Sequence, residues 1–544
     1  MRATLTLVCL LLALPVVAVL GAWVGLDAQA LATLRHQAQT VLAGYAGQSV
    51  LLALGVAAGV TLLGSATAAA VTLLDFPGRR SFEWALLLPL AMPAYVLAYA
   101  WTDALQFSGP LQTALRGWLG MRGALWPDPR SLGGAVGLFV LALYPYVYLL
   151  TRTALGERAA HLLEAARLLG AGPWRRLVAV ALPLARPAVT AGVALAVMET
   201  LADYGVGAYF GLATFSTGIL RAWLVMDDRI AAAQLASVLL AVVALVLWVE
   251  RRAQHRMRFA STRRAGGGGD AGPLRLRGGA AAAAWGLCAL PVLLGFVLPV
   301  LWLLWLLAQE LRYSEFGLPL ARFAGWAWSS FRLAGIAALL ATLLALALGF
   351  ALRPAGSRGH AGGLLAVAAA LLGLGYAVPG AVIAVGVLLP VGPLQAALPS
   401  LPVAATVTGT AFGLLLAYLS RFSAVALQSV QAGYARIGVN VDETARLLGS
   451  SRGRTFWRLH LPLLRRSALA AALLVFVDVM KELPATLLLR PFGSDTLAVV
   501  AYNLARDERL GEAALPSLAI VAVGLIPVLL LSRAMRSGDA AAAG

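Results

Sequence analysis

Long apolar stretches alternate with short polar segments along almost the whole chain. Many of these stretches reach the ~20 residues that a helix needs to cross a bilayer, and their residues do not alternate as in a half-buried strand. The pattern predicts an all-α polytopic membrane protein with about twelve spans. They are expected at 3–24, 49–74, 84–105, 132–155, 188–205, a sixth ending near 248, 281–308, 328–352, 363–390, 402–422, 467–489 and 513–532.

The first apolar run has two interpretations, a membrane span or a cleaved signal peptide. It follows Arg2 and is long enough to span a bilayer, and the sequence near Gly21 and Ala22 lacks a clear cleavage site of small residues. We therefore expect a first span. Two later spans contain an internal proline, Pro93 in the third and Pro379 in the ninth, which a span tolerates when its neighbours cover the freed backbone groups.

One polar segment occurs twice. Glu164 aligns with Glu443, Gly170 with Gly449 and Pro183 with Pro462, each pair 279 positions apart. A long repeat at a fixed offset indicates two similar halves. We expect a first permease-like half at 1–250, a basic Gly-rich linker at 251–280 and a second half at 281–544, which makes two parallel six-helix repeats.

The repeated segment has the local signals of a helix–turn–helix, which we call an elbow. Helix-forming residues fill positions 157–169, Gly170 lies where a helix stop is expected, and Pro173 suits the first position of a second helix. An ordinary charged loop is the alternative, but such a loop has no reason to recur at a fixed spacing.

Composition agrees with a membrane protein, since 61% of the residues are hydrophobic and 12% are charged. The net charge of +18 fits basic cytoplasmic loops, so nucleic acid is not an expected partner. Cys9 and Cys288 lie in apolar runs and imply no disulfide framework. The lone lysine, Lys481, does not follow a glycine, so the chain lacks the Gly-Lys pair of a phosphate-binding loop. ATP hydrolysis, if it is used, is expected in another subunit.

The two elbows resemble the EAA loop of ABC importer permeases. The resemblance is carried by Glu164, Ala165, Ala166, Gly170, Val180, Leu182 and Pro183, and again by Glu443, Thr444, Ala445, Gly449, Leu459, Leu461 and Pro462. Thr444 departs from the usual alanine. The resemblance implies a type I importer-like fold in a bacterial inner membrane, with both loops docked on a dimer of ATPase subunits in the cytoplasm. It also implies a periplasmic solute-binding protein as a partner. ATP and Mg are then bound by the ATPase subunits, and no cofactor is bound by this chain.

Charged residues inside spans are costly and need a reason. Glu199 and Asp203 follow the first elbow, and the offset of 279 places Asp478 and Glu482 after the second. Together with Tyr204 and Lys481 they are candidates for the substrate pathway. A helix-cap or salt-bridge network is an equally weighted alternative. No stable metal site is expected.

Four further segments resemble the ferric-iron branch of these permeases: residues 89–101, 198–205, 375–386 and 481–498. This resemblance implies Fe(III) delivered by the binding protein and moved by alternating access. Related permeases with this layout carry thiamine or phosphonates, so another small solute stays open, and a stand-alone secondary transporter or a membrane enzyme is less favoured. The outer segments 106–131, 212–232, 310–327 and 490–512 are the expected docking surface for the binding protein.

Overall fold

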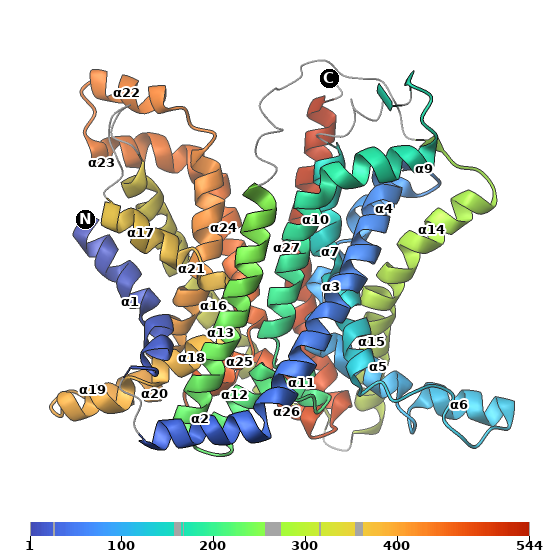
Figure 1. Ribbon diagram of the computed structural model, residues 1–544, viewed down its shortest axis with the longest axis horizontal. Coiled ribbons are helices and arrows are strands. Elements are labelled where there is room, and N and C mark those ends of the chain that lie inside the picture. Colours follow the sequence, from blue (N-terminus) through green and yellow to red (C-terminus); the bar gives the residue numbers. More distant parts are fainter. Residues whose placement is uncertain are drawn as a thin grey trace. The chain divides into compact units, whose positions relative to one another are not determined.

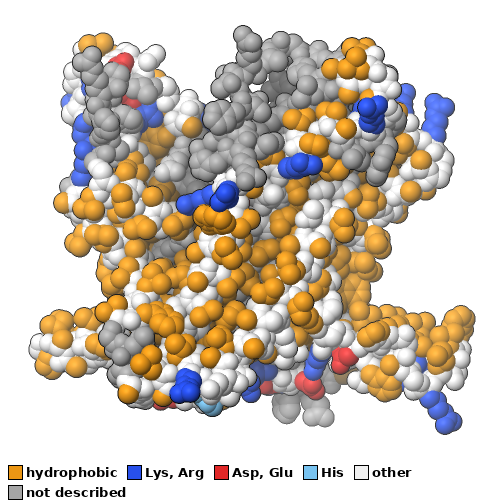
Figure 2. Space-filling model, in the orientation of Figure 1, with side chains coloured by type: hydrophobic (Ala, Val, Ile, Leu, Met, Phe, Trp, Pro, Cys, Tyr) orange, Lys and Arg blue, Asp and Glu red, His pale blue; other side chains and the backbone are white. Residues whose placement is uncertain are grey.

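The computed structural model describes residues 2–24, 28–156, 165–166, 168–255, 274–314, 317–353 and 363–542. The described chain is almost entirely helical, as expected, and its one sheet pairs two short strands, β1 (Leu74–Asp75) and β2 (Leu274–Arg275). Apolar side chains cover the helices along their lengths, whereas lysine and arginine gather toward the helix ends (Figure 2). An apolar surface of this kind suits contact with lipid acyl chains rather than water.

The chain forms two compact units, and each contains segments from both halves of the sequence. Unit 1 consists of Met1–Gln39, Gly218–Leu240 and Pro319–Val500, and unit 2 consists of Thr40–Thr217, Ala241–Leu318 and Ala501–Gly544. The two compact units therefore do not coincide with the ranges 1–250 and 281–544. As sequence repeats, the two halves stay a prediction.

Unit 1 is built on three mutually packed helices from the second half: α16 (Leu320–Leu352), α21 (Phe412–Tyr434) and α24 (Leu461–Lys481). Beside them lie α17 (Gly363–Leu372), η6 (Gly375–Ala377), α18 (Gly380–Leu388), α19 (Val391–Ala397), α20 (Val403–Gly409) and α25 (Pro484–Leu489). The elbow elements α22 (Val439–Leu447), α23 (Arg452–Thr455) and η7 (Phe456–His460) complete this part of the chain. From the first half, unit 1 takes α1 (Arg2–Gly21) and most of α2 (Ala28–Thr40).

The first helix of the chain is a packed part of unit 1. α1 lies against α17 and α18 (Figure 1) and buries Leu5, Cys9, Leu12 and Val19. A Cβ placed on Gly386 of α18 would meet the backbone of Pro15, so glycine is what allows this close approach. The helix is also long and apolar enough to cross a membrane, which supports the interpretation of this run as a span.

Unit 2 has the corresponding three-helix core, made from α3 (Leu42–Leu73), α7 (Leu132–Ala154) and α10 (Leu182–Ala202). The other first-half elements are α4 (Arg79–Ala85), η1 (Leu88–Ala91), α5 (Ala94–Leu105), α6 (Pro110–Leu119), α9 (Pro173–Arg176), η3 (Leu177–Ala181) and α11 (Gly205–Tyr209). The second half contributes α14 (Gly279–Val292), η5 (Leu293–Val297), α15 (Leu298–Tyr313) and α27 (Leu510–Ala542). Three helices, α12 (Phe215–Leu224), α13 (Arg229–His255) and α26 (Leu497–Arg506), are divided between the units.

The described residues contain ten helices long and apolar enough to cross a membrane, or eleven if the bent pair Arg79–Ala91 and Ala94–Leu119 counts as one. The expected number was about twelve. The difference is α24, which is 21 residues long but carries Arg465, Arg466, Asp478 and Lys481. The bend of 90° in the pair falls at the expected proline, Pro93, which cannot donate a backbone hydrogen bond.

Two further expectations need correction. The span expected at 402–422 runs from Phe412 to Tyr434, because Pro402 opens a separate short helix that ends at Gly409. The segments 212–232 and 490–512 were expected as outer loops. They contain α12 and α26, whose residues Ile219, Leu220 and Val499 are buried. Short packed helices therefore replace the expected loops.

Candidate functional site

The second elbow is described in full. α22 ends at Leu447, and Gly449 follows with φ 74° in the left-handed region. The N–H of Ser450 donates to the carbonyl of Ala445 over 2.9 Å, which is the hydrogen bond that closes a helix through a left-handed glycine. Ser451 then caps α23 through its side chain, which accepts from the N–H of Arg454. α22 and α23 lie together at one end of unit 1, beyond α21 and α24 (Figure 1).

The first elbow has the same geometry wherever it is described. Gly170 has φ 79°, and the N–H of Ala171 donates to the carbonyl of Ala166 over 2.9 Å. The elements that follow lie 279 positions before their counterparts: α9 before α23, η3 before η7 and α10 before α24. Glu164, the acid of the first EAA motif, lies outside the described residues, as does most of the expected helix 157–169. The left-handed glycine and the helix opened by Pro173 confirm the local prediction.

A single turn of π-helix precedes each motif proline. η3 and η7 are both π-helical, and Pro183 and Pro462 occupy the second position of the helices that follow them. A proline lacks the N–H that would bond four residues back, and its ring crowds that carbonyl, so the preceding turn widens. The proline of the motif therefore determines the geometry of the junction between each elbow and the long helix that follows it.

We expect Gly449→Val to disrupt the left-handed turn of the second elbow. A β-branched residue in the left-handed region costs about 1–2 kcal/mol or more, and a Cβ at Gly449 meets no atom within 4 Å, so the cost lies in the backbone alone. The turn should open and, if the elbow docks an ATPase subunit as its resemblance to the EAA loop implies, ATP-driven uptake should fall several-fold. Gly453→Val is the matched control, because Gly453 is equally uncrowded and has no positive φ. Equal uptake by the two variants in vesicles would contradict the role of the turn.

Each elbow exposes a pair of leucines immediately before its glycine. Leu168 and Leu169 are 83% and 88% exposed, and Leu447 and Leu448 are 88% and 81% exposed. In the first elbow, an open apolar groove of about 480 Å³ lies beside this pair. Its walls are Ala165, Ala166, Leu169, Ala179, Val180, Pro183 and Leu184. The small alanines of the motif thus line a groove together with Leu169, and the leucine pair forms an exposed apolar surface.

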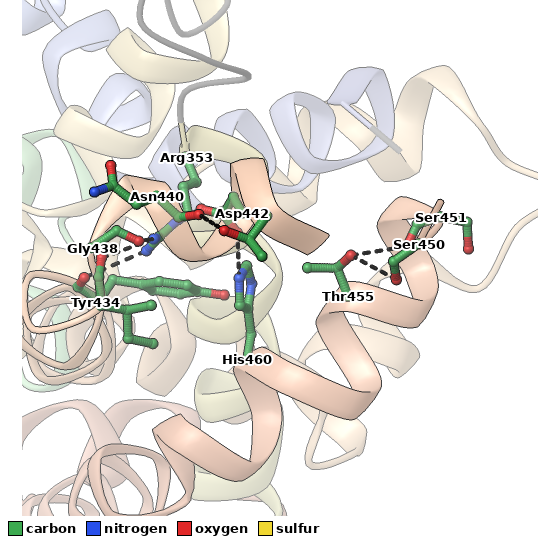
Figure 3. Close-up of polar contacts among 11 residues, drawn as sticks. Arg353, Tyr434, Gly438, Asn440, Asp442, Ser450, Ser451, Thr455 and His460 are labelled. Atoms are coloured by element: carbon green, nitrogen blue, oxygen red, sulfur yellow. Dashed lines mark hydrogen bonds and ion pairs between the residues drawn. The ribbon is translucent and has the colours of Figure 1, made fainter. Parts of the chain in front are cut away.

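A buried polar cluster of three side chains lies where α22 and η7 of the second elbow meet the end of α16 (Figure 3). We call this junction the foot of the elbow. Nε2 of His460 and Oδ1 of Asp442 are 2.6 Å apart, and Nε of Arg353 donates to the other oxygen of Asp442. Nη2 of Arg353 also donates to the carbonyls of Ile437 and Gly438. These bonds tie α22 to the end of α16 and to η7. These three residues form no motif in the sequence and were not among the predicted site residues.

The foot of the first elbow is apolar instead. The offset of 279 puts Ala181 at the position of His460 and Leu155 at that of Tyr434. Ala181 and Leu155 belong to a buried apolar cluster with Ala69 and Ala185. The two elbows therefore share the turn and the exposed leucines, but they are anchored by different chemistry.

The buried histidine predicts a pH dependence of stability. Burial lowers the pKa of His460, although the hydrogen bond to Asp442 and its charge act in the opposite direction. Above about pH 6.5, the value for an unfolded histidine, the group is neutral in both states. As the pH falls below 6.5, the unfolded chain takes up a proton at this histidine before the folded chain does, because the pKa of the folded state is lower. The free energy of unfolding therefore decreases over this range. The unfolding temperature in detergent should fall more between pH 7.5 and 5.5 than that of His460→Gln. Equal falls would contradict this assignment.

The acids after the elbows cap short helices where the long helices end. α10 stops at Ala202, and Asp203 accepts from the N–H of Val206 at the start of α11 over 2.8 Å. α24 stops at Lys481, and Glu482 accepts from the N–H groups of Ala485 and Thr486 at 3.0 Å each. Both acids thus do what the helix-cap alternative predicts. A role in the substrate pathway stays a prediction.

Glu482 has an additional partner that the first half lacks. Nη1 of Arg421 lies 3.4 Å from Oε1 of Glu482, and the exposed fractions of the two side chains are 9% and 1%. The expected span ended at 422, which placed Arg421 at its edge, whereas the observed helix runs to Tyr434 and places Arg421 in its interior. The counterpart in the first half is Ala142.

The remaining candidate residues are partly buried. Glu199 and Asp478 lie in the last turns of α10 and α24, and Lys481 ends α24. The hydroxyl of Tyr204 lies 3.1 Å from that of Tyr502 within unit 2. Among the described residues, no three His, Cys, Asp or Glu side chains are grouped so that they could hold a metal ion.

Comparisons with known proteins give one family. Residues 61–259 match the family described as binding-protein-dependent transport system inner membrane component. The chain is 26% identical over 461 residues to the Fe(3+)-transport system permease protein FbpB 2 of Haemophilus influenzae, which covers 84% of this chain and 83% of that protein.

Shorter stretches match two further permeases. The identity to the molybdenum transport system permease protein ModB of Escherichia coli is 32% over 130 residues, 24% of this chain and 55% of that protein. The identity to the putative 2-aminoethylphosphonate transport system permease protein PhnV of Salmonella typhimurium is 29% over 159 residues, 29% of this chain and 56% of that protein. The chain thus matches about half the length of these two relatives.

Proposed function

Because this chain belongs to the inner-membrane permeases of binding-protein-dependent ABC importers, we propose that its two elbows are the docking sites for a pair of ATPase subunits. The observation that carries this proposal is the repetition of one geometry at a constant offset. A left-handed glycine, an exposed leucine pair, a π-helical turn and a proline recur in the same order in both elbows. Two copies suit a partner that itself comes as two copies.

The proposed mechanism is alternating access. ATP and Mg bind to the partner subunits, and closure of those subunits moves both elbows in the cytoplasm. Each elbow is continuous with a long helix, α10 or α24, through its π-helical turn. A shift of the elbow is therefore passed along the helix to the acid that follows it, Asp203 or Glu482. The chain itself contributes no ATP hydrolysis in this scheme, and a periplasmic binding protein delivers the substrate on the other side of the inner membrane.

Ferric iron is the proposed substrate. A relative that matches 84% of this chain is a Fe(3+) permease, whereas the molybdenum and phosphonate permeases named above match a quarter to a third of it. Carboxylate and phenolate oxygens, such as those of Glu199, Asp478 and Tyr204, suit a hard cation. A second candidate is another small solute such as thiamine or a phosphonate, which the shorter matches keep open.

Reconstitution tests the proposal directly. The chain, its ATPase and its binding protein are placed in proteoliposomes and offered radiolabelled Fe(III), thiamine, molybdate or 2-aminoethylphosphonate. ATP-dependent uptake of iron that needs all three components is the expected result. Uptake of another solute would retain the importer and replace the substrate. Uptake without the ATPase would refute the docking role of the elbows.

The substrate pathway has its own test. Glu199→Gln combined with Asp478→Asn should lower ATP-driven uptake at least tenfold without loss of assembly, because these acids are proposed to face the translocated cation. Assembly is followed by co-purification of the ATPase, and Glu250→Gln on α13 serves as a control for the loss of a partly buried acid outside the elbows and the outer segments. Full transport by the double variant would remove both acids from the pathway.

A further inference from the structure

A pocket of about 270 Å³ lies at the foot of the second elbow, within unit 1. Its walls come from α1, the end of α16, α22, α23, η7 and the turn between α22 and α23. The lining residues are Arg2, Phe350, Ala351, Arg353, Asp442, Arg446, Ser450, Arg452, Thr455 and His460. Segments far apart in the sequence thus meet around one small cavity.

The wall of this pocket carries an excess of positive charge. Four of the lining residues are arginines, and the one acid, Asp442, is engaged by Arg353 and His460. The charges of Arg2, Arg446 and Arg452 are therefore not balanced by an acid of the wall. Converging guanidinium groups repel one another unless an anion lies between them, and guanidinium is the group that best matches phosphate oxygens.

Polar groups other than the arginines face the same cavity. Oγ1 of Thr455 lies 3.1 Å from Oγ of Ser450 and 3.1 Å from the carbonyl of Ser451 (Figure 3), and when Thr455 donates to Ser450, the hydroxyl hydrogen of Ser450 is left for a further acceptor. His460 is 1% exposed, and its Nδ1 has no hydrogen-bond partner among the described residues. A buried nitrogen without a partner costs free energy. With Nε2 facing the carboxylate of Asp442, Nδ1 of the neutral ring is an acceptor, so an occupant that carries a hydroxyl group, such as a hydrogen phosphate ion or a glycerol headgroup, would give this nitrogen a donor.

In the first elbow, the sequence replaces three of the polar residues of this pocket. At the offset of 279, Ala171 stands for Ser450, Pro173 for Arg452 and Ala181 for His460. Ala181 is buried among apolar side chains. Since both elbows share the turn and the leucine pair, the basic pocket is not needed to build an elbow. It is a separate feature of the second one.

We propose that this pocket binds a phosphate group. Arg2, Arg446 and Arg452 would hold its oxygens, with the hydroxyl of Ser450 as an additional donor. The group belongs either to an anionic phospholipid or to a free phosphate ion. The pocket lies where α1 begins and α16 ends, both of them long and apolar enough to cross a membrane. Basic pockets at the ends of spans are where lipid headgroups bind. The binding itself does not depend on the proposed transport function.

Two charge-matched double variants of the full chain test this proposal. Arg446→Gln with Arg452→Gln removes two charges from the pocket. Arg454→Gln with Arg458→Gln removes two from the same elbow without touching the pocket wall. All four side chains belong to exposed residues, so the substitutions should leave the fold intact. Circular dichroism of each purified variant checks this.

Binding is measured with inorganic phosphate by calorimetry in detergent, and with phosphatidylglycerol against phosphatidylcholine in nanodiscs by native mass spectrometry. We expect the pocket variant to bind at least tenfold more weakly and the control within twofold of wild type. Loss in the phosphate arm alone identifies a free ion, and loss in the lipid arm identifies a headgroup. Absence of binding by the wild-type chain, or equal weakening in both variants, overturns the proposal.

Discussion

Replacing the four exposed leucines of the elbows with aspartate should abolish ATP-driven transport while leaving the chain folded. Leu168, Leu169, Leu447 and Leu448 are each more than four-fifths exposed, so their loss removes little internal packing. If an ATPase covers them, each contributes about 1.5–3 kcal/mol by burial. Losing one pair should weaken docking about 100-fold or more, and new carboxylates in an apolar interface add a desolvation cost.

The measurement is co-purification of the ATPase, followed by uptake in proteoliposomes. Variants in one elbow, Leu168→Asp with Leu169→Asp or Leu447→Asp with Leu448→Asp, show whether both sites are needed. Leu401→Asp is the control, because Leu401 is 53% exposed and lies outside the elbows. A quadruple variant that retains the ATPase as well as wild type does would place the docking surface elsewhere.

The turn of each elbow could be predicted because the residues that form it lie close together in the sequence. Glycine at position 170 or 449 permits the positive φ, Pro173 opens the next helix, and the proline at 183 or 462 sets the widened turn before it. Each signal acts within a few residues, so it can be read without knowledge of the partners in space. The constant offset of 279 then confirms each copy by the other.

The exchange of helices between the two halves could not be predicted in the same way. A helix such as α1 is apolar on all sides, so its sequence does not indicate which neighbour it will choose. Its contact with α18 depends on a small residue, Gly386, that comes more than 360 positions after Pro15. Close approach of this kind is visible only once both backbones are placed.

The buried charges were missed for a related reason. Arg421 and Arg353 each lay at the edge of an expected element, where an arginine is ordinary. Asp442 adjoins the motif acid Glu443, and its own position in the motif gives no signal of a separate role. The partners of these residues lie 18, 61 and 89 positions away. A sequence signal was available for Arg421, since mostly apolar residues continue after it from Phe422 to Leu427, which indicates that the helix does not end there.

Removing the carboxyl group of Glu482 should destabilise the chain more than removing that of Asp203, although the two acids occupy equivalent positions. Glu482→Ala leaves the guanidinium of Arg421 buried without its acid, and the N–H groups of Ala485 and Thr486 without an acceptor. Breaking a buried pair from one side costs about 3–5 kcal/mol. Asp203→Ala removes a helix cap, which costs about 1 kcal/mol.

Unfolding midpoints in detergent and the yield of monodisperse protein should rank wild type, Asp203→Ala and Glu482→Ala in that order. Arg421→Met combined with Glu482→Gln is the decisive control, because it removes both charges and keeps an oxygen for the backbone donors. It should recover most of the stability, since the cost comes from the unpaired charge rather than from the lost pair. If Glu482→Gln alone keeps full stability yet abolishes uptake, the acid acts on the substrate. If it loses stability and retains specific uptake per folded molecule, its role is to join α25 to α21, and the pathway is formed by other residues.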